Sequence, residues 1–354
     1  MYLFKCLAKQ YADQKPFAIY RKPDSKTVVG LFQKTYTLHK VETFEEQGFV
    51  LAPFAEGTRF YIPLIESAIV KEAQEEIAFD LSEVKLNYND KQAKEDFEDL
   101  VERCVKAIKN NLFGKVVPSR IESVPYQVED IGLLFKKLCS IYPTAFCSLV
   151  YHPEIGLWVG ATPETLLSLK DNTLKTMALA GTQVNHGQEI VEWGVKEQEE
   201  QLFVTDFITA TLKPFVQTIS TSEPYSKRAA KVMHICTDIT ATLNDKNLKP
   251  IVEALHPTPA VCGMPKEVAR DFLVREEGYY RGYYAGYLGE LNCNVEQENT
   301  DETNLFVNLR CMNIEEDSVN LYIGCGVTID SDPSSEFIET VNKSSTMKKV
   351  LNLS

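Results

Sequence analysis

Residues 304–347 have the sequence NLFVNLRCMNIEEDSVNLYIGCGVTIDSDPSSEFIETVNKSSTM, which predicts two strands, a glycine turn and a helix. Residues 305–310 and 319–323 combine the aliphatic and aromatic side chains that are typical of strands. The glycines after the second strand form the turn. Asp332 is suited to cap the helix, and Pro333 would take its first position, where the missing N–H costs nothing.

The charged side chains of this stretch fall on consecutive elements. Arg310 ends the first strand. Glu336, Glu339 and Lys343 recur on the helix at spacings of three and four residues, so they share one face. An arginine, the backbone N–H groups of a glycine turn, two carboxylates and a lysine suit a small molecule with several carboxylates, held in part by magnesium.

The composition excludes several classes of protein. With 354 residues, 44% hydrophobic and 25% charged, the chain is an ordinary globular one. Its net charge of −13 argues against nucleic acid or an anionic membrane as a partner. The nine cysteines include no C-x-x-C pair, which indicates reduced thiols. The sequence contains neither a signal-peptide pattern nor an apolar run of membrane-spanning length, so we expect a soluble cytoplasmic protein.

Hairpin-like strand pairs dominate over strict βαβ alternation. We therefore expect an α+β fold with antiparallel sheets covered by helices. Residues 1–85 predict short strands and turns, and the extended segment 115–120 contains Pro118, which implies an edge or a bulge. The remaining periodicity predicts helices over about 90–111, 131–141, 188–213, 248–255 and 266–276.

A second acidic pair, Glu197 and Glu200, lies on the predicted helix 188–213. Both align with the apolar stripe continued by Val204 and Ile208, so they should point inward at one end of the helix. The alternative is a solvated acidic face, since further glutamates crowd nearby. Two inward carboxylate pairs are costly unless a cation neutralises them, and Mg²⁺ accepts a few carboxylates together with water and a substrate oxygen.

Several motifs in this order resemble those of the chorismate-utilising enzymes. This family includes anthranilate synthase component I, aminodeoxychorismate synthase, isochorismate synthase and salicylate synthase. The motifs are KVVPSR (115–120), GATPE (160–164), AGT (180–182), KEQEE (196–200), HPTPAVCGMP (256–265) and the run 324–347. The resemblance covers about 95–352 and leaves 1–90 as a divergent part of a single chorismate-binding domain, 1–354. It implies two intertwined halves with antiparallel sheets packed face to face, helices outside, and the site between them.

The resemblance also implies catalytic roles. Lys115 would be a general base that activates water, and Glu164 a general acid with a raised pKa. Taken alone, Lys115 could be a solvent-exposed lysine at a strand end, and Glu164 a carboxylate at a helix N-terminus capped by Thr162. Glu197, Glu200, Glu336 and Glu339 would hold Mg²⁺. Gln201 departs from the family, where many members have histidine.

The substrate contacts are likewise implied by the resemblance. Gly181 and Thr182 would offer donors to a carboxylate, and Arg310 and Lys343 would bind carboxylates beside the backbone N–H of Gly324. Tyr284 could contact the substrate or serve as a core aromatic side chain, and His234 could be a core histidine. His256, in a loop that is similar to the isochorismate synthase form, would also bind the substrate.

The activity implied is that of an isochorismate synthase, which interconverts chorismate and isochorismate for menaquinone or siderophore synthesis. Lys115 argues against anthranilate synthase component I, which typically has glutamine there to use ammonia, and Pro259-Ala260 argues against a salicylate synthase. A chorismate-sensing binding module without catalysis is the alternative outside enzymes. We expect a monomer, because the sequence shows no exposed heptad or apolar helix.

Overall fold

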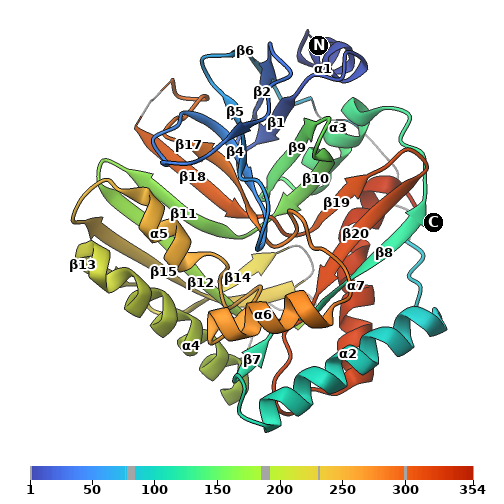
Figure 1. Ribbon diagram of the computed structural model, residues 1–354, viewed down its shortest axis with the longest axis vertical. Helices are drawn as coiled ribbons and strands as arrows, with labels where there is room; N and C mark the ends of the chain where they lie inside the picture. Colours follow the sequence, from blue (N-terminus) through green and yellow to red (C-terminus); the bar gives the residue numbers. More distant parts are fainter. Residues whose placement is uncertain are drawn as a thin grey trace.

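The computed structural model describes residues 2–75, 77, 84–184, 192–229, 232–298 and 301–353, and it contains two large antiparallel sheets (Figure 1). The first sheet has the order β6 (Ser67–Ala73), β2 (Thr27–Gln33), β1 (Phe17–Arg21), β9 (Phe146–His152), β10 (Gly156–Thr162), β19 (Cys311–Ile314), β20 (Ser318–Gly324) and β8 (Ser119–Pro125). The second has the order β13 (Val216–Thr221), β15 (Val232–Leu243), β12 (Thr173–Val184), β11 (Thr165–Lys170), β18 (Glu302–Val307), β17 (Tyr287–Leu291), β4 (Gly48–Ala52), β5 (Phe60–Pro63) and β3 (His39–Lys40).

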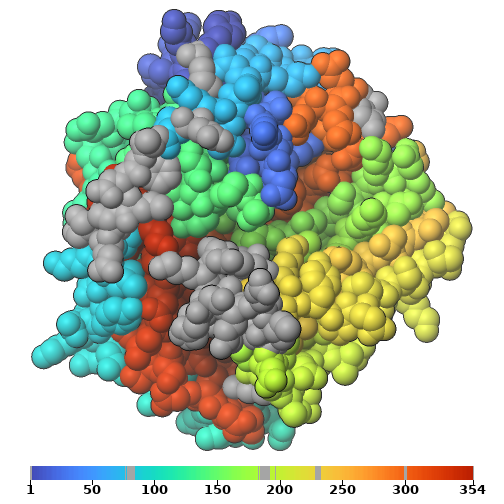
Figure 2. All heavy atoms as spheres, turned by 180° about the vertical axis from the view of Figure 1, so that it is seen from behind, coloured from blue at the N-terminus to red at the C-terminus, as the bar shows by residue number. Residues whose placement is uncertain are grey.

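Smaller elements complete the architecture. Strand β14 (Tyr225–Ala229) also pairs with β15, and β7 (Lys115–Val116) pairs with β16 (Gly263–Met264). The helices are α1 (Tyr2–Ala12), α2 (Lys91–Lys109), α3 (Ile131–Ile141), α4 (Val195–Leu212), α5 (Leu248–Leu255), α6 (Lys266–Glu276) and α7 (Pro333–Leu351), with one 3₁₀ turn at Lys213–Phe215. Both sheets draw strands from distant parts of the chain, and α2 lies beside α7 on the surface (Figure 2). The expected α+β fold of two intertwined halves is confirmed.

Aromatic side chains join the two sheets face to face. Phe146 of the first sheet stacks on Phe306 of the second, with ring centroids 4.1 Å apart. Tyr20 of the first sheet packs in turn on Phe49 of the second at 5.0 Å. All four side chains are buried, so this stack forms the centre of the core between the sheets.

Helices cover the outer faces. Along β1, Phe17 and Ile19 belong to an outer cluster with residues of α1, α3 and α7, whereas Ala18 and Tyr20 belong to the inner core. This alternation follows from the two-residue period of a strand. On the second sheet, α4 packs against β12 and β15, and α5 packs against α4. Strands β1, β4, β9 and β17 are buried along their whole length.

Most predicted helices are confirmed. Helix α7 begins where the sequence predicts, and the Asp332 side chain accepts a hydrogen bond from the backbone N–H of Ser335 at 2.8 Å. Helices α2, α3, α5 and α6 match their predicted ranges within two residues. Helix α4 begins at Val195, so the predicted helix was wrong at residues 192–194, and residues 188–191 of the prediction lie outside the described part of the chain. None of the described helices is long and apolar enough to cross a membrane.

Two predictions about the fold were wrong. Residues 2–12 form a helix, not strands and turns, because Leu3 and Leu7 lie one helical turn apart and bury against the first sheet. The predicted strand 305–310 ends at Val307, and the chain then passes to the first sheet, where β19 was not predicted. The second difference has consequences for the site, because Arg310 lies in that passage.

The aromatic stack predicts where stability is concentrated. Phe146→Ala should lower the free energy of unfolding by about 3–5 kcal/mol, because it leaves a cavity between the two sheets. Urea unfolding monitored by circular dichroism measures the change. The control is Leu133→Ala on α3, whose side chain is exposed and should change stability by less than about 0.5 kcal/mol. A loss below about 1 kcal/mol for Phe146→Ala would show that the stack does not join the sheets.

Candidate active site

The chain crosses between the two sheets at two neighbouring places. Strand β10 of the first sheet continues into β11 of the second through Glu164, and β18 of the second continues into β19 of the first through Arg310. The crossovers are joined by hydrogen bonds from Val307 N to Glu164 O (3.0 Å) and from Ala161 N to Arg310 O (3.0 Å). Glu164 and Arg310, which are far apart in sequence, therefore lie on crossovers that are side by side.

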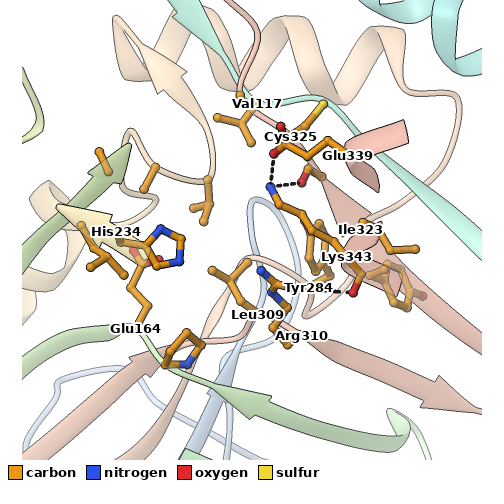
Figure 3. Close-up of a pocket in the computed structure, with 18 of the residues that line it drawn as sticks. Val117, Glu164, His234, Tyr284, Leu309, Arg310, Ile323, Cys325, Glu339 and Lys343 are labelled. Carbon is orange, nitrogen blue, oxygen red and sulfur yellow. Dashed lines mark hydrogen bonds and ion pairs between the residues drawn. The ribbon is translucent and has the colours of Figure 1, made fainter. Parts of the chain in front are cut away.

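A cavity of about 280 Å³ lies above these crossovers, between the sheets and helices α4 and α7. It is lined by most of the residues that the sequence predicted, namely Lys115, Glu164, Gly181, Glu197, Glu200, Tyr284, Arg310, Gly324, Glu336, Glu339 and Lys343. Figure 3 shows Glu164 and His234 across the cavity from Glu339 and Lys343, with Arg310 between them. The side chain of Thr182 lies outside the described part of the structure.

Lys115 is buried at the cavity wall. It belongs to β7, which pairs with β16, and only 8% of the residue is exposed. Its ammonium group forms an ion pair with the Glu200 carboxylate. The alternative interpretation of Lys115 as a solvent-exposed lysine is therefore wrong.

Glu164 is buried as well, and it lies in a strand crossover. The alternative interpretation of a helix N-terminus is wrong, although Thr162 Oγ1 does accept a hydrogen bond from Glu164 N at 3.2 Å. Burial raises the pKa of the Glu164 carboxyl to about 7, while the nearby Lys115 ammonium and Thr258 hydroxyl act in the opposite direction. A carboxyl with this pKa can donate a proton near neutral pH.

Helix α4 brings the first acidic pair to the cavity. Glu197 and Glu200 are half-buried there, whereas Glu199 is exposed, so the helix does not present one uniform acidic face. The helix comes close to a bulge in β12 at Gly181, which has a φ of +70°. A Cβ atom on Gly181 would lie 3.1 Å from Glu197 Cβ, so glycine permits the close approach of this helix.

Helix α7 brings the second acidic pair and a lysine. Lys343 Nζ forms an ion pair with Glu339 Oε1 at 2.6 Å and donates to the Gly324 carbonyl at 3.0 Å. Gly324 thus meets Lys343 through its carbonyl oxygen, where a backbone N–H contact to a ligand was expected. Burial raises the pKa of the Glu336 carboxyl, and its Oε2 is buried without a hydrogen-bond partner.

Arg310 presents a cation to the cavity. It has a φ of +48° and is half-buried, with Nη1 donating to Thr346 Oγ1 at 3.0 Å. In the described part of the chain it has no carboxylate within ion-pair distance. A guanidinium in the wall of a cavity is suited to a carboxylate of a ligand, which it can bind through two parallel hydrogen bonds.

His234 and Tyr284 complete the polar wall. His234 Nδ1 lies 3.2 Å from the Gly181 carbonyl, and burial, with Arg310 acting in the same direction, lowers the pKa of its imidazole to about 4. The ring is therefore neutral at pH 7 and can contact a ligand as a hydrogen-bonding group. Tyr284 is buried and stacks on Tyr322. The sequence left both roles open, and the structure places both side chains in the cavity wall.

His256 was expected to bind the substrate, and the structure places its ring away from the cavity. Its Nε2 lies 3.0 Å from the Pro53 carbonyl, and its ring packs edge-on against Tyr287 at 5.0 Å. His256 does not line the cavity. The loop that follows it reaches the cavity through Ala260 and Val261, for which the residue types offered no signal.

The residues fit a magnesium ion by their chemistry. Four carboxylates from α4 and α7 line one cavity, and the buried oxygen of Glu336 without a partner favours a cation. Glu200 and Glu339 are instead paired with lysines, and the described residues contain no group of three side chains close enough to hold an ion by themselves. Mg²⁺ suits such an open arrangement, since it keeps several waters and uses ligand oxygens.

The raised pKa of Glu164 predicts how stability depends on pH. Folding favours the protonated form, so this contribution is fully present below the ordinary pKa of 4.5 and is lost as the pH rises through about 7. Glu164→Gln should therefore gain stability relative to the wild type between about pH 5 and about pH 8, by on the order of 3 kcal/mol. Urea unfolding at both pH values tests this, with the exposed Glu199→Gln as control. The same pH dependence in Glu164→Gln and wild type would exclude the raised pKa.

Known proteins resemble this chain over most of its length. The family model described as "Chorismate binding enzyme" matches residues 60–352. The salicylate biosynthesis isochorismate synthase of Pseudomonas aeruginosa is 32% identical over 74% of this chain and 56% of its own length. Isochorismate synthase MenF of Escherichia coli is 30% identical over 73% of this chain and 61% of its own length, so the chain spans less than two thirds of either relative.

Structural similarity extends further along the chain. The structure of MenF, the menaquinone-specific isochorismate synthase from Escherichia coli, covers 96% of this chain and 89% of its own, with a TM-score of 0.78 and 22% identity. This similarity concerns the fold, including the N-terminal strands that the sequence resemblance did not reach. From the family match over residues 60–352, we conclude that the chain belongs to the family of chorismate binding enzymes.

Proposed function

We propose that this protein is a magnesium-dependent isochorismate synthase, which converts chorismate into isochorismate by adding water at C2 and releasing the C4 hydroxyl. The observation that carries the proposal is a buried lysine and a buried carboxyl with a pKa of about 7 in the wall of one cavity, Lys115 and Glu164. The two relatives named above are called isochorismate synthases, which supports the same activity.

Chorismate carries two carboxylates, and the cavity holds cations for them. Arg310 and Lys343 would bind carboxylates by charge-assisted hydrogen bonds, with neutral His234 and Tyr284 alongside. Mg²⁺ bound by Glu197, Glu200, Glu336 and Glu339 would neutralise a substrate carboxylate and the acidic pairs together. These contacts would hold the ring between Lys115 and Glu164.

The two catalytic groups have opposite tasks. Lys115 would accept a proton from water as its oxygen bonds to C2, and Glu164 would donate a proton to the C4 hydroxyl, which leaves as water. Lys115 can act as a base only as a neutral amine, and its ion pair with Glu200 stabilises the ammonium form. Lys115 must therefore give up its ammonium proton before it can accept one from water.

The use of the product is part of the proposal. We propose that isochorismate from this protein feeds menaquinone or siderophore synthesis. The basis is the names of relatives, one described as menaquinone-specific and another as acting in salicylate biosynthesis.

Incubation with chorismate and Mg²⁺, followed by chromatography with mass detection, tests the activity. The expected product has the mass of chorismate and a new retention time. Salicylate with pyruvate would indicate a salicylate synthase, and anthranilate formed with ammonia an anthranilate synthase. Binding of chorismate without conversion under all conditions would indicate a binding module.

The role of Lys115 is tested by Lys115→Ala. It should lower kcat by about 10²–10⁴-fold, because it removes the base, while chorismate binding measured by calorimetry persists. Lys213→Ala, which replaces a lysine in the turn after α4, is the control. Full turnover by Lys115→Ala would remove this residue from the mechanism.

The role of Glu336 is tested by Glu336→Gln, which removes the charge of a half-buried carboxylate that has one buried oxygen without a partner. The Mg²⁺ concentration for half-maximal activity should rise at least about 10-fold, the scale of a lost ligand-shell interaction. A Mg²⁺ titration of the melting temperature should shift in parallel, which gives a readout independent of activity. An unchanged Mg²⁺ requirement in both measurements would exclude Glu336 from the metal site.

A further inference from the structure

The strand that carries Lys115 bends at Pro118. Before the bend, β7 pairs with β16, and after it, β8 pairs with β20, so the chain changes partners within a few residues. Proline has no N–H, and a bend of this kind removes its neighbours from the regular ladder. The groups at the bend must find other hydrogen-bond partners, because they are buried.

A buried ion pair provides those partners. Arg281 and Glu277 are almost fully buried, with Nη2 and Oε1 2.5 Å apart and Nε donating to Oε2 at 2.7 Å. Arg281 Nη2 also donates to the Val117 carbonyl at 2.6 Å. Glu277 Oε1 accepts from the Ser119 N–H at 2.8 Å and from its hydroxyl at 2.9 Å. The pair therefore holds the chain on both sides of Pro118.

The same guanidinium reaches a second wall of the cavity. Arg281 Nη1 donates to the Val261 carbonyl at 3.0 Å. In the turn that begins at Arg281, Tyr284 N donates to the Arg281 carbonyl at 3.1 Å. Val117, Val261 and Tyr284 all line the cavity, whereas Arg281 and Glu277 do not. One ion pair thus connects three segments of the wall from behind.

We propose that Arg281 and Glu277 are positioning residues for the reaction, which hold Lys115 and the loop at Val261 in their catalytic arrangement. This inference rests on the proposed function. A buried ion pair contributes little net stability, and apolar residues of similar size often serve equally well. What apolar residues could not supply is the set of hydrogen bonds to Val117, Ser119 and Val261.

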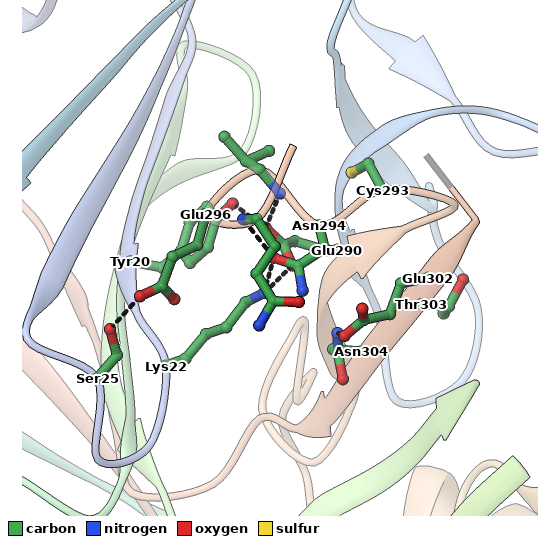
Figure 4. Close-up of polar contacts among 12 residues, drawn as sticks. Tyr20, Lys22, Ser25, Glu290, Cys293, Asn294, Glu296, Glu302, Thr303 and Asn304 are labelled. Atoms are coloured by element: carbon green, nitrogen blue, oxygen red, sulfur yellow. Dashed lines mark hydrogen bonds and ion pairs between the residues drawn. The ribbon is translucent and has the colours of Figure 1, made fainter. Parts of the chain in front are cut away.

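A second buried ion pair offers a matched control. Lys22 Nζ lies 2.6 Å from Glu290 Oε2, and Glu290 Oε1 accepts hydrogen bonds from Tyr20 Oη at 2.5 Å and from Val295 N at 2.9 Å (Figure 4). It also connects separate segments, yet none of these four residues lines the cavity. Breaking it should affect stability alone.

The experiment compares Arg281→Lys with Lys22→Met. Lysine keeps the charge of Arg281 but loses the fork that reaches two carbonyls and a carboxylate together. For Arg281→Lys, assayed well below its melting temperature, we expect kcat to fall by about 10–100-fold, as for a misplaced catalytic group. KM for chorismate should change by less than about 3-fold, and Lys22→Met should keep the wild-type kcat.

Two further variants guard against a folding defect. Glu277→Gln keeps the shape of the acceptor and should lower kcat in the same way. Arg281→Ala leaves a guanidinium-sized space, so added guanidinium ion at low concentration should restore part of its kcat and none of the activity of Lys115→Ala. Where Arg281→Ala does not fold, Arg281→Lys and Glu277→Gln decide.

The outcomes separate the two proposals. An inactive wild-type protein would overturn the proposed function. An active wild type with wild-type kcat in both Arg281→Lys and Glu277→Gln, whatever their melting temperatures, would overturn the positioning role. An equal fall in kcat for Lys22→Met would also overturn the positioning role, because the loss of activity would then follow the loss of stability.

Discussion

The site depends on the hydrogen bonding of two strand crossovers to each other. Backbone bonds from Val307 to Glu164 and from Ala161 to Arg310 hold the crossovers side by side where the chain leaves one sheet for the other. Because these bonds involve only the main chain, they set the spacing of the acid and the arginine irrespective of side-chain motion. Helices α4 and α7 then close the cavity over the two crossovers and add the carboxylates of the two acidic pairs.

Local signals explain why much of the fold was predictable. The cap at Asp332 and the periodicity of α2 and α3 involve residues within a few turns of one another, so the sequence carries them directly. The crossovers are different. Residues 305–310 have one continuous strand-like pattern, and nothing in it signals that Val307 and Cys311 pair in different sheets. Val307 pairs with Tyr287, 20 residues before it, whereas Cys311 pairs with Gly160, more than a hundred residues away.

A site residue was predictable where its position on a helix or strand also determines the direction of its side chain. Glu336, Glu339 and Lys343 share a helix face, and that face meets the cavity. His256 lies away from the cavity because its ring turns toward Pro53, a contact with the divergent N-terminal part that the loop motif does not reveal. His234 was left open because the bulge at Gly181 on the neighbouring strand decides what its side chain meets, and no pattern along β15 reveals that bulge.

The cavity shares the acidic character of the protein, with five glutamates against two lysines and one arginine in the described part of its lining. The net charge of the protein is −13, and the two lysines of the cavity pair with carboxylates there, whereas Arg310 has no carboxylate within ion-pair distance among the described residues. Burial of Glu164 adds a kinetic property. At neutral pH a carboxyl with a pKa of about 7 is divided almost equally between its acid and its base form. In the proposed reaction the group that protonates a leaving hydroxyl must deprotonate water in reverse. The buried Glu164 side chain can therefore serve as the acid of the forward reaction and as the base of the reverse reaction at the same pH.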